Sequence, residues 1–387
     1  MHILQNCSTE SLNYKMSLLY PKSQHPPDAE HITIYYNRHE FCGWPFNHGF
    51  WRFANDELVI SFSRGPCGYQ NKYDMSHAVV DALGGEYVAL RSTDSGRTWP
   101  VDGLVSLGTR LALERQLLAN LVPAAPTTPI DFTAPDLCLT AGFGIPPKDA
   151  RDVGYIQLSR DRGHTWEGPL PLPSFGFAWV QVKVDYLVRP DGVVLLFVTV
   201  GQRDGRRGDR FVTVYATTDG GLTWNYLSAI QPTTPDAGFV NRYYASPVLL
   251  PDGRILAALR CQIDARNAWP ELFESADGGR TWHFVTRISD WGGPTHLLRL
   301  ADGRLLASYG YRIKPYGIRA RLSVDDGRTW EPELILRDDA GSWDLGYPRT
   351  VQLGNGQVMV AYYHNRADDP IQCDGGVRHI AGTIFRP

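Results

Sequence analysis

One eight-residue pattern recurs five times along the chain, and it constrains the possible folds more than any other feature. It reads STDSGRTW at residues 92–99, and the other copies occupy 159–166, 217–224, 275–282 and 323–330. Successive copies begin 67, 58, 58 and 48 residues apart. Self-similarity at such a period indicates a repeat architecture, in which each repeat is one supersecondary unit.

The residues of the pattern predict a tight turn between two strands. Its Asp can accept hydrogen bonds from the backbone N–H groups of its own loop, and its Gly permits a positive φ. A Thr and a Trp then begin the next strand, and the Trp covers the turn with a large apolar face. We therefore interpret each copy as a structural element that contacts no substrate by itself.

A second series of signals is typical of β-hairpins. Asp-Gly or Asn-Gly separates apolar runs at 191–192, 252–253, 302–303 and 355–356, with a weaker Asn-Asp at 55–56. Each should join the first and second strands of a unit, while the eight-residue pattern joins the third and fourth. Together the two series give six units, of which the second lacks a hairpin signal and the sixth lacks the eight-residue pattern.

Six four-stranded units arranged radially predict an all-β protein, a six-bladed β-propeller. A seven-bladed ring that uses the N-terminal segment is the alternative. Residues 1–30 are polar and proline-containing and are expected to form an extension, with residues 31–387 as one propeller domain. The alternating segment 31–36 could close the ring by pairing with the last unit, and 111–121 could form a short helix or a loop between units.

Composition limits the partners and cofactors. The net charge of −3 gives no global attraction to nucleic acid or to an anionic membrane. The six cysteines show neither zinc-ligand spacing nor a disulfide framework. The sequence implies no metal or organic cofactor, and a structural calcium stays open. The first residues lack the basic and apolar regions of a signal peptide, and no apolar run is long enough to cross a membrane, which favours a cytoplasmic protein. The oligomeric state stays open.

The expected topology indicates where functional side chains should meet. The starts of first strands and the ends of second strands lie on the face opposite the tight turns, where they surround one mouth near the axis. Arginines recur at the ends of second strands, and His364 has the equivalent place in the sixth unit; the arginines are Arg64, Arg203, Arg260 and Arg312. Singly, each could be an ordinary solvated residue. Jointly, they predict a carboxylate or sulfate ligand, because a guanidinium group binds such anions through two N–H groups.

Polar and aromatic residues recur at the starts of first strands. They are Asn47, His48, Tyr244, His296 and Tyr347, with Trp44, Asp131, Asp344 and Arg349 close in sequence. Asp74 and His77 lie in the long connection after Arg64 and could form part of a lid. A single His or Tyr at a strand start usually packs or forms a hydrogen bond, whereas several at one radial level favour a site.

The eight-residue pattern is similar to the Asp-box, or BNR repeat, of the sialidase superfamily, which the chain resembles from about Trp44 onward. Members of that superfamily use an arginine triad for the substrate carboxylate, a Tyr nucleophile activated by a Glu, and an Asp as acid and base. The resemblance implies Tyr347 as the nucleophile, Arg260 as a triad arginine, and the loop of Asp74 as the source of the acid. Asn47 and His48 stand where the first triad arginine is expected, and Ala245 stands where one Glu is expected. The resemblance implies a second Glu near Tyr363 and His364.

Three functions fit these residues. The first is an exo-acting glycoside hydrolase for a terminal acidic or heavily hydroxylated sugar, in which Arg260, Arg312 and either Arg64 or Arg203 hold the anionic group. Tyr347, His48 and Asp344 would then transfer protons. The second is a lyase that performs β-elimination on a uronic acid with His48 and Tyr347. The third is a propeller that binds a glycan without catalysis.

Overall fold

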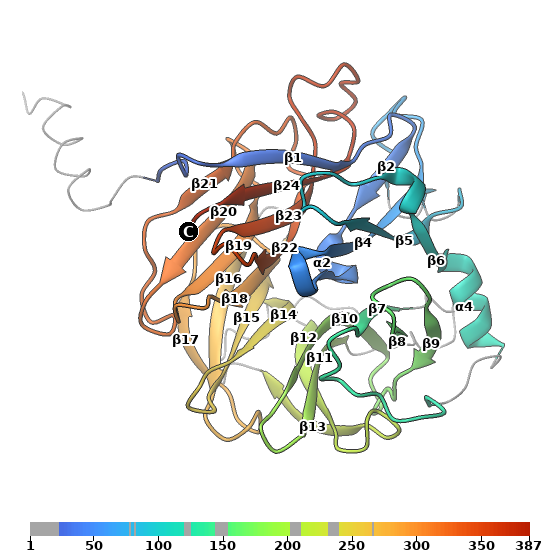
Figure 1. Ribbon diagram of the computed structural model, residues 1–387, viewed down its shortest axis with the longest axis vertical. Coiled ribbons are helices and arrows are strands. Elements are labelled where there is room, and N and C mark those ends of the chain that lie inside the picture. Colours follow the sequence, from blue (N-terminus) through green and yellow to red (C-terminus); the bar gives the residue numbers. More distant parts are fainter. Residues whose placement is uncertain are drawn as a thin grey trace, which may run out of the picture.

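Six antiparallel β-sheets are arranged radially around one axis (Figure 1). The computed structural model describes residues 23–76, 79–80, 83–119, 125–143, 154–201, 210–230, 240–264 and 267–387. The described secondary structure is mostly β-sheet. The exceptions are the helices α2 (Pro45–His48) and α4 (Arg110–Leu118), the helical residues 79–80, and two short 3₁₀ turns at Ala54–Asp56 and Val101–Gly103. The predicted six-bladed β-propeller is therefore confirmed.

The first two blades depart from four strands. The first contains β2 (Glu40–Gly43), β3 (Phe50–Arg52), β4 (Leu58–Pro66), β5 (Glu86–Ser92) and β6 (Val105–Thr109). The second has three strands among the described residues: β7 (Cys138–Phe143), β8 (Gly154–Ser159) and β9 (Glu167–Pro171). This second blade is the unit in which the sequence shows no hairpin signal.

The other blades have four strands each. The third contains β10 (Trp179–Val188), β11 (Val194–Gly201), β12 (Arg210–Thr217) and β13 (Asn225–Ile230). The fourth contains β14 (Asn241–Leu249), β15 (Ile255–Gln262), β16 (Ala268–Ser275) and β17 (His283–Arg287). The fifth contains β18 (Thr295–Arg299), β19 (Leu305–Tyr311), β20 (Gly317–Ser323) and β21 (Leu334–Arg337). The sixth contains β22 (Gly346–Gln352), β23 (Val358–His364), β24 (His379–Phe385) and β1 (Glu30–Tyr35).

Both series of turn signals lie where they were predicted. In the fourth blade, Asp277 Oδ1 accepts hydrogen bonds from the backbone N–H groups of Arg280 and Thr281, at 3.0 and 2.9 Å. Gly279 has a φ of 92°, and Trp282 Nε1 donates to its carbonyl at 3.2 Å. The hairpin signals join first to second strands, although in this blade the connection runs over residues 250–254 rather than over two residues. Local turn chemistry therefore explains the repeat.

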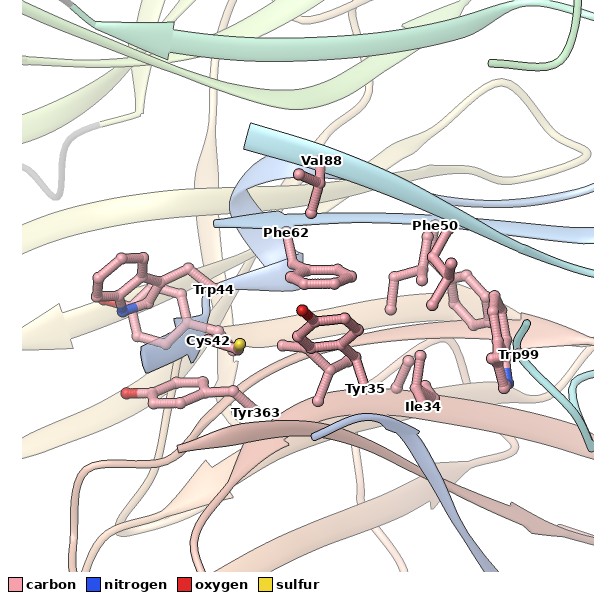
Figure 2. Packing of buried hydrophobic residues seen from close by; sticks show 14 of the residues in the cluster. Ile34, Tyr35, Cys42, Trp44, Phe50, Phe62, Val88, Trp99 and Tyr363 are labelled. Atoms are coloured by element: carbon pink, nitrogen blue, oxygen red, sulfur yellow. The ribbon is translucent and has the colours of Figure 1, made fainter. Parts of the chain in front are cut away.

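The N-terminal strand closes the ring. β1 pairs antiparallel with β24, with Glu30 opposite Ile384, so it completes the last blade instead of starting a seventh. Tyr35 of β1 then packs on Phe62 of the first blade, with ring centroids 5.5 Å apart (Figure 2). The six-bladed closure was one of two possibilities in the sequence, and this pairing excludes the seven-bladed ring.

The core lies between the blades. Buried apolar side chains of the described residues form six clusters, and each cluster joins two neighbouring blades. A middle strand is covered on both faces by its neighbours, which explains why all eight residues of β11, VLLFVTVG, are buried. α4 (Arg110–Leu118), capped by Thr109, packs between the first and second blades. It confirms the helical option for residues 111–118 of the predicted segment.

The inner strand of the first blade is interrupted, and this interruption positions the site. β2 and β3 both pair with β4, and residues 44–49 leave the sheet between them to form the one-turn helix α2 (Pro45–His48). Gly49 returns the chain with a φ of 115°, where a Cβ would overlap the Trp51 indole. α2 lies at the centre of the ring and contacts β4, β7, β10, β22 and β23 (Figure 1).

Asn47 and His48 were expected at the start of a first strand, and this placement was wrong. Both residues belong to α2, and the strand begins after them at Phe50. An excursion of six residues out of a strand leaves no hydrophobic period by which the sequence could reveal it. The helix nevertheless brings both residues to the axis, where the mouth was expected.

Candidate active site

Two arginines from different blades bracket Tyr347. Tyr347 is the second residue of β22 and has a φ of 50°. Arg260 Nη1, on β15, donates a hydrogen bond to the Tyr347 hydroxyl at 3.2 Å. The guanidinium carbon of Arg312, directly after β19, lies 5.5 Å from the centre of the Tyr347 ring. Blades four, five and six thus bring together three residues that the sequence proposed for one site.

Within the described chain, neither Arg260 nor Arg312 has a carboxylate within ion-pair distance. Arg260 Nε is buried without a hydrogen-bond partner among the described residues. Arg312 donates to the Leu345 carbonyl at 3.2 and 2.9 Å and to the Tyr363 hydroxyl at 3.3 Å. Arg260 is buried and Arg312 is half-buried, and the charge of Asp344 acts on Arg312 without an ion-pair contact. A cation that is largely removed from water is costly without a close counter-charge, so both arginines are suited to an anionic ligand.

A tyrosine and a carboxylate stand beside Tyr347. The rings of Tyr347 and Tyr363 are 5.9 Å apart, and the Tyr363 hydroxyl donates to Asp344 Oδ1 at 2.7 Å. Asp344 Oδ2 lies 3.2 Å from Nε of Arg378, a fully buried side chain. Burial raises the pKa of Tyr363 well above its ordinary value, and the Asp344 charge adds to the effect. Tyr363 therefore connects Asp344 to Tyr347.

A cavity of about 90 Å³ lies beside Tyr347, against α2. Five residues of the predicted site line it: Trp44, Asn47, His48, Tyr244 and Tyr347. The sequence reasoning missed the others, namely Ser63, Tyr87, Arg110, Ala141, Gly142, Gln181 and Lys183. Aspartate and glutamate are absent from this lining among the described residues.

The cavity holds its titratable groups away from water. His48 is 4% exposed and shares a hydrogen bond of 2.8 Å with Ser63 Oγ. Burial lowers its pKa well below the ordinary 6.5, so the imidazole is neutral at pH 7. Lys183 Nζ lies 4.9 Å from the centre of the Tyr244 ring. Burial lowers the Lys183 pKa and raises that of Tyr244.

The innermost strand of the third blade carried a signal that was available in the sequence. In the strand WVQVKVDYLV, the polar residues Gln181, Lys183 and Asp185 alternate with valines. Gln181 and Lys183 line the cavity, and Asp185 binds Arg349. Three polar residues at period two in a buried strand indicate a polar face, in this case toward the axis.

The sequence of the blades matches a known family model. The model of the BNR repeat-like domain covers residues 144–360, more than half of the chain. The chain belongs to the BNR repeat-like family, within the sialidase superfamily.

Two curated relatives of this BNR repeat-like protein are sialidases. The one from Micromonospora viridifaciens is 28% identical over 272 residues, which cover 59% of the chain and 40% of the relative. The one from Paraclostridium sordellii is 22% identical over 236 residues, which cover 54% of each protein. The chain thus spans about half or less of the length of these relatives.

Solved structures agree on the fold. A protein of unknown function from Dyadobacter fermentans has a TM-score of 0.70 and 27% identity, and the match covers 92% of the chain and 99% of that protein. Trypanosoma rangeli sialidase in complex with 2,3-difluorosialic acid has a TM-score of 0.60 at 12% identity, covering 93% and 59%. Penicillium chrysogenum α-L-arabinanase, complexed with arabinobiose, has a TM-score of 0.56 at 12% identity, covering 93% and 99%. The last two share the propeller fold alone with this chain.

Arg349 of the BNR repeat-like protein does not line the cavity but anchors α2. It forms two contacts with the Asp185 carboxylate, at 2.6 and 3.0 Å, and donates twice to the Phe46 carbonyl, at 3.1 and 2.9 Å. Both charged side chains are 7% exposed. This ion pair connects the third and sixth blades to the helix at the axis.

Several other predicted residues lie outside the cavity lining. Arg64 binds Glu86 at 2.7 Å and also donates to the Tyr35 hydroxyl, so a carboxylate of its own blade already pairs with its charge. His296 Nδ1 accepts the Thr350 N–H at 3.2 Å. His364 is fully buried, with Nε2 3.2 Å from Asp339 Oδ1.

The acidic candidates in loops are bound by their own loops. Asp74 accepts from the backbone N–H groups of Gln70 and Asn71, at 2.7 and 3.3 Å. Asp131 accepts in the same way from Thr133 at 2.9 Å. Arg203 and His77 lie outside the described residues.

Two positions differ from what the resemblance implies for a sialidase. Ala245 is buried in the apolar cluster between the third and fourth blades, so this position offers no carboxylate. Tyr363 stands beside Tyr347 near the place expected for another Glu.

In the described ranges, no group of three or more His, Cys, Asp or Glu side chains could hold a metal ion. No helix in this part of the chain is long and apolar enough to span a membrane.

Proposed function

We propose that this protein is an exo-acting glycoside hydrolase for a terminal acidic sugar. The observation that supports the proposal most is the pair Arg260 and Arg312, which contact Tyr347 from two sides and have no ion-pair partner in the described chain. Guanidinium groups in this state bind a carboxylate or sulfate through charge-assisted hydrogen bonds. Sialidase and arabinanase relatives support a glycosidase-like propeller of this kind.

Tyr347 is the proposed nucleophile. Its oxygen would form a bond to the anomeric carbon and release its proton, while the glycosidic bond breaks and the leaving oxygen takes up a proton. Water would then attack the anomeric carbon, the bond to the Tyr347 oxygen would break, and this oxygen would take a proton back as the free sugar leaves. Arg260 Nη1 donates to the Tyr347 oxygen, which stabilises the phenolate that develops there. The neutral imidazole of His48 lines the same cavity and is in the correct state to accept a proton. Asp74 remains the predicted acid for the leaving oxygen.

The test is a panel of sialosides, uronides and rhamnosides incubated with the purified protein, with the products identified by mass. Tyr347→Phe and His48→Ala should each lower turnover at least about a hundredfold, the low end of an acid or base contribution. Tyr226→Phe, at a half-exposed ring on the outer strand β13, is the matched control and should turn over normally. Unchanged turnover in both site variants would contradict the residue assignment.

A lyase is the second candidate, and a specific observation favours it. No carboxylate lines the cavity within the described chain, whereas His48 and Tyr347 both do. β-Elimination from a uronic acid needs one base and one acid but no pair of carboxylates. A lyase forms an unsaturated uronide that absorbs in the ultraviolet, which a hydrolase does not. Saturable binding of an oligosaccharide without either product would instead identify a glycan-binding propeller.

A further inference from the structure

Two basic side chains line the cavity beside Tyr347. Lys183, 3% exposed, reaches it from β10, and Arg110 reaches it from the start of α4. Asp185, the nearest acid on the same strand, already accepts two hydrogen bonds from Arg349. The side chains that line the cavity therefore place two basic groups, but no described carboxylate, around about 90 Å³ of space.

The wall of the cavity also contains buried polar atoms without a partner. Gln181 Oε1 and His48 Nδ1, on residues that are 5% and 4% exposed, form no hydrogen bond with the described chain, and neither does Asn47 Oδ1. Buried polar groups are normally hydrogen-bonded, so this wall is built for a polar occupant. A single water needs about 10–15 Å³ of such space, and the cavity has room for a larger group.

Arg260 and Arg312 do not line this cavity, although both contact Tyr347. Tyr347 therefore lies beside two groups of basic side chains, the two arginines outside the cavity lining and Lys183 with Arg110 inside it.

We propose that the cavity is a second anion subsite, and that the substrate is a sugar with two acidic substituents, such as a sulfated uronic acid. One substituent binds Arg260 and Arg312, and the other binds Lys183 and Arg110. The sugar hydroxyls supply donors for Gln181 Oε1 and Asn47 Oδ1. That the anion belongs to a sugar rests on the proposed function, whereas the anion subsite itself does not.

Anion binding in this cavity should be coupled to proton uptake. Burial lowers the pKa of Lys183 well below its ordinary value, Arg110 and Arg349 lower it further, and Asp185 opposes them. The other titratable side chains that line the cavity are His48, Tyr87, Tyr244 and Tyr347. An anion beside Lys183 favours the ammonium form of that side chain. The affinity of the cavity for the anion should therefore fall as the pH rises.

The decisive experiment isolates the cavity from the two arginines. Sulfate is titrated calorimetrically into R260M/R312M and into R260M/R312M/K183M at pH 7, with thermal unfolding as the folding control. The first variant should bind sulfate, and K183M should weaken binding about tenfold to a hundredfold, as expected for a lost charge-assisted hydrogen bond. Absence of binding in the first variant, or equal binding in both, would overturn the subsite.

The substrate class is tested on the wild-type protein. A sulfated uronide should bind at least about tenfold more tightly than the same uronide without sulfate, and the uncharged parent sugar should bind more weakly than either. Titration of sulfate in two buffers of different ionisation enthalpy should reveal proton uptake, and this measurement does not depend on the folding of any variant. Equal affinity for the two uronides would refute a second acidic substituent. Sulfate binding without turnover of any sugar would refute the proposed function but leave the subsite standing.

Discussion

Replacing Arg349 with Met tests how the helix at the axis is held. The substitution removes the charge partner of Asp185 and both donors to the Phe46 carbonyl. Breaking a buried ion pair by removing one partner costs about 3–5 kcal/mol, because a buried charge is left uncompensated. The two side chains are each 7% exposed, which places this pair in that class. R349M should therefore lower the free energy of unfolding by about 4 kcal/mol at pH 7.

The pH dependence of this loss has a defined sign. Burial already raises the pKa of Asp185 above its ordinary 3.8, and Arg349 acts against this rise. In R349M the folded-state pKa of Asp185 rises further above its unfolded value, so the folded variant holds a proton that the unfolded chain has released. The variant should then regain stability relative to the wild type as the pH falls, by about 1–3 kcal/mol between pH 7 and pH 5.

Denaturant unfolding followed by tryptophan fluorescence, at both pH values, measures these quantities. Asp185→Asn and the double variant complete a cycle, and the coupling energy should exceed about 2 kcal/mol. Arg366→Met is the matched control, because its ion pair with Asp368 is largely exposed and should contribute less than about 1 kcal/mol. A loss below about 1 kcal/mol in R349M at pH 7, together with weaker ligand binding, would refute the anchoring role and support Arg349 as a direct ligand of the substrate.

Two further predictions concern stability. Asp277→Ala should lower the free energy of unfolding by about 1–2 kcal/mol, by analogy with the loss of a helix cap, because Asp277 accepts hydrogen bonds from two backbone N–H groups and two hydroxyls of its turn. The control Asp290→Ala, at an exposed side chain, should change it by less than about 0.5 kcal/mol. Equal effects of the two variants in denaturant unfolding would contradict the turn chemistry. Burial lowers the pKa of His364 and of His379 to about 4. As the pH falls below 6.5, the unfolded chain therefore takes up protons before the folded protein does. The free energy of unfolding should then fall between pH 6.5 and 4, by up to about 3 kcal/mol for each histidine. His379→Gln should flatten this dependence in thermal unfolding scans over that range, and an unchanged profile would argue against neutral burial of His379.

The sequence by itself determined the ring and the turns. The Asp-box and hairpin signals predict turns because their hydrogen bonds form within a few residues, as between Asp277 and Thr281, and such chemistry needs no knowledge of distant contacts. The spacing of these turns then defined six units, and the alternation at residues 31–36 indicated the strand that closes the ring. The sequence also placed Arg260, Arg312 and Tyr347 at one site, because residues at the ends of second strands and at the starts of first strands surround the same mouth.

The tertiary structure alone decided what fills the axis. Arg349 binds a carboxylate 164 residues away and a carbonyl 303 residues away, and no local pattern encodes such pairs. The same holds for Arg64, whose strand-end position matches that of Arg260 but whose charge is taken by Glu86 of the next strand. Whether an arginine at the mouth stays available for a ligand depends on which carboxylate the folded chain brings within reach, and that is a property of the whole ring.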